Sequence, residues 1–600
     1  MGPESPQSAP YRELAARVAD RLESNRSSDE PLAPWPEEVI VSSGGVAGAI
    51  AAALLAKVPQ GVAALRMQSL ETLAQRIVNE AGDYPRLALE EERRLAMRLA
   101  VRDVDHPMME TRGAAAMLER SYRDVRDSGL TLTEFLERVN RTPSLRSRDR
   151  IRTVTRAWVD YERLIRRLGA IDPADLLARA TSLVKSGARV NPQIVAGFYD
   201  MTGAQQALIA ALPVVESWSP AIDGRAIVAT SPEIVISEQT TREEEARAVC
   251  IRVAQLLASG TPVRSIGIVA RSLEPYDVHL FHRFAREAGF TATAPEQSPL
   301  TAHRIGRALT ILITLRERDF PRTDVLELIR SGLRLETRIN ADKADVETRR
   351  RPIAGGTSAS LRDRATSSLV LGDYVSAVAE LETITAQIDE RWLARTADLF
   401  RVEDESDLAA LDAIDRIAAI FQRATAWNRP FDASALLDIL KQAMLNGPRS
   451  AGVWLGDVMS FRGRSFEHLF AVRMQDSLVP QRRVEDPLLT DSDRRALGLR
   501  EIGNGRDEER LLFDLIIAGA GTIHFSYSSS DGFGTPLRAS QYLKALAIER
   551  EPEKKHEILK NFSRYVAERH PERFEGKTED RRLKPAPRHA RILPRAMPDV

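Results

Sequence analysis

The sequence predicts an α/β protein with two parallel-sheet domains, each interrupted by a large helical insertion. Short β-branched apolar runs fall into two separate groups, and long stretches of helical periodicity lie inside each group. Buried strands that alternate with helices favour parallel sheets. The chain has 600 residues, of which 43% are hydrophobic, so it can form several cores.

The first predicted domain comprises residues 37–85 and 189–224, and residues 86–188 between them form a helical insertion. The domain opens with the strand-like run EEVIVSS, which leads through a glycine turn into a helix. It returns to a strand at PQIVAGF. This order of elements predicts an α/β core that a helical insertion interrupts.

The second predicted domain comprises residues 225–300 and 446–545, and residues 301–445 form its helical insertion. Two strand-like runs, EIVISEQ and RSIGIVARS, flank a long helix, which is typical of a parallel strand–helix–strand unit. Further strands are expected at RAIVATS, GVWLGDVMS, HLFAVRM and TIHFSYSS.

Both ends of the chain are polar. Residues 1–36 are dotted with proline and predict a leader that holds one short amphipathic helix. Residues 546–600 form a highly charged tail that is too short and too polar for another core. The tail holds the only G-K-[ST] sequence, Gly576–Lys577–Thr578, which follows no strand and is best explained by chance.

The bulk composition excludes several classes of protein. The formal net charge is zero, so any binding to nucleic acid depends on local basic patches. Cys250 is the single cysteine, which excludes an internal disulfide and an iron–sulfur cluster. No apolar run approaches the ~20 residues of a membrane span, and the N-terminus lacks a secretion signal. We therefore expect a cytoplasmic protein with no membrane partner.

Two parallel α/β cores suit a motor that binds ATP in the cleft between them, but three parts of its chemistry are absent. A phosphate loop needs a lysine and a hydroxyl, and a magnesium site needs an acidic pair. The second core must add arginines that reach the phosphates. The residues that stand at these three pairs of positions are Gly48 and Ala49, Ala196 and Gly197, and Gly519 and Gly521. These losses predict an inactive nucleotide site, although ordinary glycine turns of an unrelated α/β protein also fit.

Several segments, in order, resemble superfamily 1 helicases of the UvrD kind, and more specifically the inactivated AddB/RecC-type subunits of bacterial helicase–nucleases. IVAGFYDMTGAQ is similar to L-V-D-E-F-Q-D-T-x-x-x-Q, and SLETLAQRI is similar to T-F-H-x-F-A-x-R-I. FRGRSFEHLFAVRMQDSLVP is similar to a stretch with K-G-L-E-F and a later F-P. The resemblance covers about residues 37–545 and implies two RecA-like domains.

The resemblance also implies a function. Such a chain is expected to be a non-catalytic DNA-binding scaffold in double-strand break repair and recombination, beside an active AddA/RecB-like helicase–nuclease subunit. AddB-type chains continue into a PD-(D/E)xK nuclease domain, whose acidic cluster we do not find in the tail. Two alternatives stay open: the front part of a split or truncated nuclease, and a protein-interaction scaffold without DNA binding.

Candidate DNA contacts are the residues at motif positions that face the strand in relatives. They are Ser69, Arg462, Arg464, Arg482 and Arg483. Hydroxyl and arginine side chains can contact phosphates, but a solvated turn at FRGR and a surface loop at QRR explain the same residues. Arg271 fits a structural ion pair or a relic of nucleotide contact. We expect no bound cofactor and no metal, since the histidines at 279 and 282 lack further ligands.

Overall fold

A computed structural model confirms the α/β class and the two parallel-sheet domains with helical insertions. It describes residues 9–25, 35–58, 64–111, 113–143, 145, 147–222, 225–226, 232–294, 297–447, 451–481, 485–502, 505–531 and 533–546. Nearly all of the predicted charged tail, including residues 576–578, lies outside the described residues. None of the helices within these ranges has both the length and the apolar character that crossing a bilayer requires.

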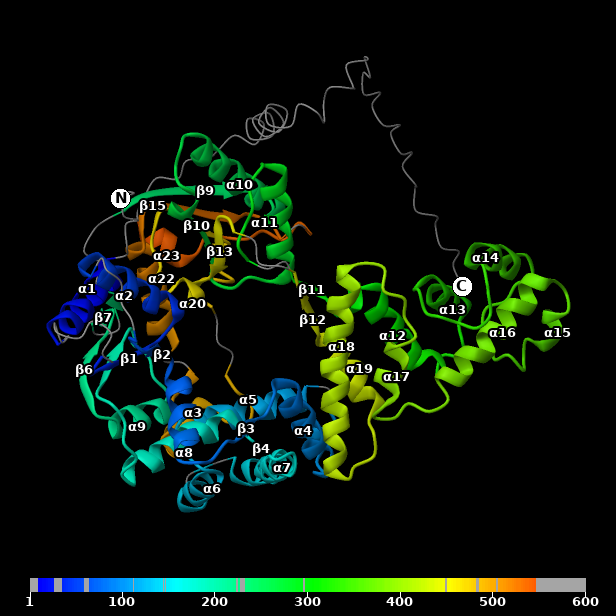
Figure 1. Ribbon diagram of the computed structural model, residues 1–600, viewed down its shortest axis with the longest axis horizontal. Coiled ribbons are helices and arrows are strands. Elements are labelled where there is room, and N and C mark those ends of the chain that lie inside the picture. Colours follow the sequence, from blue (N-terminus) through cyan, green and yellow to red (C-terminus); the bar gives the residue numbers. More distant parts are fainter. Residues whose placement is uncertain are drawn as a thin grey trace, which may run out of the picture.

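The first sheet has four parallel strands in the order β2-β1-β5-β6 (Figure 1). The strands are β1 (Glu38–Val41), β2 (Met67–Gln68), β5 (Gln193–Ala196) and β6 (Val214–Trp218). Alternate residues of β1 face opposite sides, so Val39 and Val41 pack against α1 and α2 while Ile40 packs against α3, α8 and α9. These helices are α1 (Ala9–Ser24), α2 (Gly44–Lys57), α3 (Leu70–Glu80), α8 (Pro173–Lys185) and α9 (Gly203–Ala211). Burial on both faces explains why the strands read as apolar runs.

Helix α1 corrects the prediction that residues 1–36 are a leader. Tyr11, Leu14, Val18 and Leu22 are buried at helical spacing and join the core that α2 forms on the first sheet. Arg21 pairs with the buried Glu37, which fixes the far end of the helix. The amphipathic stripe is visible in the sequence, and its docking surface appears only once β1 and α2 are assembled.

The second sheet has five parallel strands in the order β13-β10-β14-β15-β9. Helices α10 and α11 cover one face, and α20, α22 and α23 cover the other (Figure 1). The strands are β9 (Glu233–Gln239), β10 (Ile266–Ala270), β13 (Trp454–Asp457), β14 (Phe466–Val472) and β15 (Ala520–Ser528). The helices are α10 (Arg242–Ala258), α11 (Pro275–Glu287), α20 (Val458–Phe461), α22 (Gly505–Ala518) and α23 (Gln541–Ala545).

The predicted strand over residues 452–460 is shorter than expected. It ends at Asp457, whose side chain accepts a hydrogen bond from the backbone N of Ser460 at 2.7 Å and starts the single turn of α20. Of the strand expected at RAIVATS, only β8 (Arg225–Ala226) is described; it pairs with β7 (Ala221–Ile222), and residues 227–231 lie outside the description.

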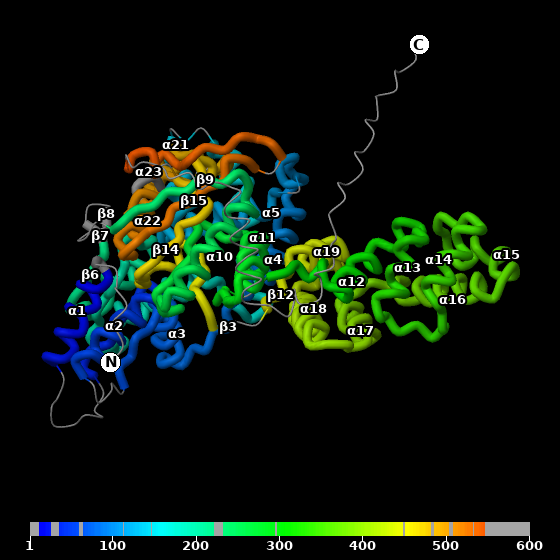
Figure 2. Tube along the Cα trace, turned by 90° about the horizontal axis from the view of Figure 1, so that it is seen from above, coloured from blue at the N-terminus to red at the C-terminus, as the bar shows by residue number. Residues whose placement is uncertain are grey.

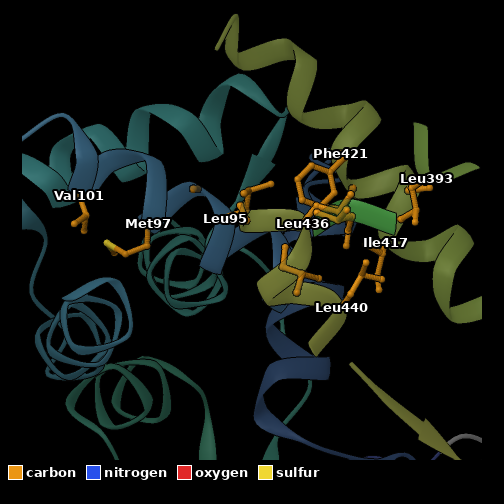
Figure 3. Packing of buried hydrophobic residues seen from close by; sticks show 14 of the residues in the cluster. Leu95, Met97, Val101, Leu393, Ile417, Phe421, Leu436 and Leu440 are labelled. Carbon is orange, nitrogen blue, oxygen red and sulfur yellow. The ribbon is translucent and has the colours of Figure 1, made fainter. Parts of the chain in front are cut away.

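The two helical insertions share one hydrophobic core, although they belong to different sheet domains. Leu95 of α4 lies beside Phe421 of α18 and Leu436 of α19, and Met97 and Val101 of α4 belong to the same cluster on the side away from these two helices (Figure 3). The first insertion contains α4 (Glu90–Arg102), α5 (Ala114–Asp127), α6 (Leu132–Arg141) and α7 (Arg148–Arg167), with a short parallel pair of β3 (Arg86–Leu87) and β4 (Ala170–Ile171) at its base. The second contains α12 (Arg304–Leu315), α13 (Arg322–Arg330), α14 (Ala341–Arg350), α15 (Arg362–Ala365), α16 (Leu369–Ile384), α17 (Trp392–Ala397), α18 (Glu405–Ala424) and α19 (Ala433–Gln442).

Polar contacts reinforce the junction between the insertions. The indole nitrogen of the buried Trp427 donates to the carbonyl of Leu164 at 2.8 Å, and Arg423 pairs with the fully buried Glu92 at 2.7 Å. The second insertion leaves its own sheet domain through a two-stranded ribbon of β11 (Gln297–Pro299) and β12 (Met444–Asn446), and its far helices extend to the right in Figure 2. The insertions therefore form one helical body.

The segment 485–502 ties the second sheet domain to this helical body. Ser121 and Ser147 of the first insertion donate to Asp486 and Asp493 at 2.5 and 2.6 Å. Arg494 of the short helix α21 (Asp491–Leu497) donates to Asp124 at 2.6 Å. Buried carboxylates and hydroxyls that satisfy one another fix the path of this segment.

Candidate functional site

Helix α2 begins directly after β1, where the sequence places the phosphate loop. The Ser43 hydroxyl caps the helix by accepting from the N of Val46 at 3.3 Å. Gly48 faces open space, since no atom lies within 4 Å of a Cβ built on it, and Ala49 is buried. The lysine of α2 is Lys57, which lies in the last turn and pairs with Asp20 of α1. Helix α2 thus brings no cation to its N-terminus.

Backbone from the second sheet domain lies against the N-terminus of α2. The Ser43 hydroxyl donates to the carbonyl oxygen of Arg462 at 3.1 Å. A Cβ on Gly45 would stand 2.1 Å from that same oxygen, and a Cβ on Gly463 would stand 2.3 Å from the N of Val46. Helix N-termini are good phosphate sites because their N–H groups and dipole attract anions. Here the turn that contains Arg462 and Gly463 takes the space that phosphates need.

The acidic-pair position is closed in the same way. Ala196 ends β5 and is fully buried, and Gly197 follows with a left-handed φ of +83°. A Cβ on Gly197 would stand 2.7 Å from the Ser42 hydroxyl and 3.0 Å from a methyl group of Val46. Any larger residue would strain the backbone and collide with α2, so this position has no room for a carboxylate.

The arginine-pair position is filled by apolar packing and backbone. A Cβ on Gly519 would stand 2.3 Å from Cζ of Phe461, and one on Gly521 would stand 3.1 Å from the carbonyl oxygen of Glu467. Leu511 and Leu515 of α22 pack with Tyr11 and other residues of the first domain in a single core cluster. The two sheet domains therefore meet through close apolar contact.

Arg271 forms a structural ion pair, as the sequence allows. Its Nε lies 3.0 Å from both carboxylate oxygens of Glu509, which is 3% exposed and also accepts from the N of Gln481 at 3.0 Å. Burial of Arg271 opposes its charge, but the hydrogen bond to Glu509 and the attraction of nearby carboxylates together outweigh this effect, so the pKa of Arg271 is raised. Nothing in the sequence around Arg271 identified Glu509 as its partner.

The sequence-predicted DNA contacts divide into three groups. Ser69 caps α3, its hydroxyl accepting from the N of Thr72 at 3.2 Å, and it stays half-buried. Arg462 and Arg464 flank the glycine turn at the domain junction, and partial desolvation lowers the pKa of Arg464. Arg482 and Arg483 lie outside the described residues.

Two aromatic residues that the sequence did not single out support this turn. The Cζ atom of Arg462 lies 5.7 Å from the ring centre of Tyr199, and that of Arg464 lies 5.4 Å from the ring centre of Trp454. Burial raises the pKa of Tyr199, and the nearby Arg462 opposes the rise. Tyr199 follows a strand and Trp454 starts one, so the local sequence gives no signal that each ring meets a distant arginine.

A lysine introduced at position 48 tests whether the cleft between the two sheet domains can accept a nucleotide. We expect Gly48→Lys to gain neither DNA-stimulated ATP hydrolysis nor thermal protection by ATP, because the Arg462–Gly463 backbone occupies the phosphate space. Gly48→Ala is the control, and it should stabilise α2 by about 0.5–1 kcal/mol since Gly48 is helical and uncrowded. Hydrolysis by Gly48→Lys that Gly48→Ala lacks would contradict a filled site.

Within the described ranges, no three His, Cys, Asp or Glu side chains come together as a metal site. No protein-family model matches the sequence, and no curated protein is similar enough to be matched.

Proposed function

We propose that the chain is a non-catalytic DNA-binding scaffold subunit of a helicase–nuclease complex that acts in double-strand break repair and recombination. Its partner would be an active UvrD-like helicase–nuclease subunit of the AddA/RecB kind. The order of motif-like segments supports this family, and the protein-filled cleft supports a role without ATP hydrolysis.

The observation that carries DNA binding is the unneutralised charge of Arg462 and Arg464. Two other arginines near the same junction are paired, Arg271 with Glu509 and Arg500 with Asp200. Arg462 and Arg464 form no ion pair with any residue that the structure describes. Two cations without ion-pair partners on one turn attract polyanions. The charged groups of polyanions in the cell are most commonly phosphates.

A salt titration tests this proposal. We expect the purified chain to bind single-stranded or forked DNA, with log affinity falling linearly as log salt rises. Arg464→Ala should lower affinity about tenfold, because it removes one charge-assisted phosphate contact. It should also make the salt slope shallower by about 0.7 on a single strand. The measurement is fluorescence anisotropy with labelled DNA at several salt concentrations.

The matched control is Arg416→Ala, since Arg416 is 67% exposed on α18 and pairs only with Asp412 one helical turn away. It should leave affinity and slope unchanged. Absence of binding even at low salt would reject DNA binding and favour a protein-interaction scaffold. Metal-dependent DNA cleavage by the purified chain would instead favour the nuclease alternative.

A further inference from the structure

The turn at Arg462–Gly463–Arg464 holds both guanidiniums over aromatic rings. Each arginine is also fixed by its Nε, which donates to a backbone carbonyl one helical turn back: Arg462 to Met459 at 3.0 Å and Arg464 to Ser460 at 3.2 Å. Ring and carbonyl together fix the near end of each guanidinium. A cation over an aromatic face gains about 0.5–2 kcal/mol and stays charged.

The ring under Arg464 is itself held rigidly. Trp454 stacks on Phe466 with ring centres 5.4 Å apart and lies 5.9 Å from Phe461. Gly456 leaves space for the indole, since a Cβ there would stand 2.3 Å from a ring carbon of Trp454. A fixed platform means that Arg464 loses little side-chain freedom when it meets a ligand.

The ring under Arg462 comes from the other sheet domain. Tyr199 lies just after β5 of the first domain, packs against the cores of both sheet domains, and has its hydroxyl buried. The contact between Arg462 and Tyr199 therefore exists only while the junction between the domains is closed. Gly45 and Gly463 allow the junction to close, because neither has a side chain to hold the Arg462–Gly463 turn away from the N-terminus of α2.

We propose that the Arg462–Gly463–Arg464 turn is a phosphodiester clamp whose two guanidiniums are positioned by Tyr199 and Trp454, one ring from each sheet domain. This inference rests on the proposed DNA binding and adds how the contact is made. The hydrogen bonds that Arg462 and Arg464 donate to described residues use Nε, and the planar fork of a guanidinium matches two phosphate oxygens. The clamp reads no base, so its affinity is independent of sequence.

Removing a ring tests the clamp without removing a charge. Trp454→Leu and Tyr199→Leu should each weaken binding of a labelled oligothymidine and of a mixed-sequence strand by about fivefold. This factor corresponds to a loss of about 1 kcal/mol of binding free energy, because the guanidinium is no longer held in position by the ring. The salt slope should stay near that of the unaltered chain, because both arginines remain. Tyr199→Phe keeps the ring and should bind as the unaltered chain does.

The outcomes separate this inference from the proposed function. If the unaltered chain binds no DNA, both fail. If Arg464→Ala weakens binding while the ring variants bind like the unaltered chain, the clamp is overturned and DNA binding stands. Should Trp454→Leu fail to fold, the comparison of Tyr199→Leu with Tyr199→Phe decides, since a purely structural tyrosine would lower the melting temperature without changing the affinity of the folded fraction.

Discussion

Gly463→Ala is expected to open the junction between the two sheet domains. Gly463 has a φ of +81°, and a Cβ there would stand 2.3 Å from the N of Val46 and 2.5 Å from the carbonyl carbon of Gly45. A left-handed alanine costs about 1–2 kcal/mol, and the collision with backbone adds about 1–3 kcal/mol. We expect the junction to lose about 3 kcal/mol of stability, measured as faster hydrogen exchange in α2 and the turn.

Gly48→Ala is the matched control, because it lies in the same helix and meets no neighbouring atom. It should leave exchange at the junction unchanged or slower. Exchange in Gly463→Ala equal to that of the unaltered chain would show that the glycine contact does not hold the domains together. DNA affinity should decrease as the stability of the junction decreases, because the ring of Tyr199 is then separated from Arg462.

Glu509→Ala is expected to give the second large effect. The carboxylate is almost completely buried, accepts three hydrogen bonds from Arg271, and also accepts from the N of Gln481. Its removal leaves a half-buried guanidinium and a backbone N–H without partners, which costs about 3–5 kcal/mol. A clear drop in the melting temperature and in the urea midpoint should follow.

The double variant Arg271→Met with Glu509→Leu should recover much of this loss, because it removes both charges and keeps apolar volume. Asp412→Ala on the exposed surface of α18 is the control and should cost less than about 1 kcal/mol. A similar small effect for Glu509→Ala would mean that the Arg271 ion pair does not stabilise the junction between β10 and α22.

The sequence predicted the two sheets because their central strands are buried on both faces. β10 is an unbroken apolar run, β1 ends in the apolar residues VIV and β14 ends in LFAV, and such runs are visible without any knowledge of partners. The two-residue strand β2 and the docking of α1 could not be predicted, because each depends on a surface that distant segments build. The shared core of the two insertions could not be predicted either, because the apolar face of each helix is compatible with many partners.

The sequence also showed that the positions compared with an ATP site carry glycine and alanine, but it could not show what surrounds them. Gly45 and Gly463 carry no side chain, so their importance lies only in how closely two distant backbones approach. Arg462 and Arg464 were recognised from their place in a motif. In the sequence, Tyr199 and Trp454 cannot be distinguished from other aromatic residues, because each ring meets its arginine only in the folded structure.

The close approach of Gly45 and Gly463 makes it difficult for an ATP site to arise in this cleft by single substitutions. A lysine introduced at position 48 would find the Arg462–Gly463 backbone in the space where phosphates would bind. A change that first moved this backbone away would expose Tyr11 and Leu515 to water and lower stability before any benefit appeared. Each single step is thus neutral or harmful, so we expect sequences that descend from this one to keep the junction closed.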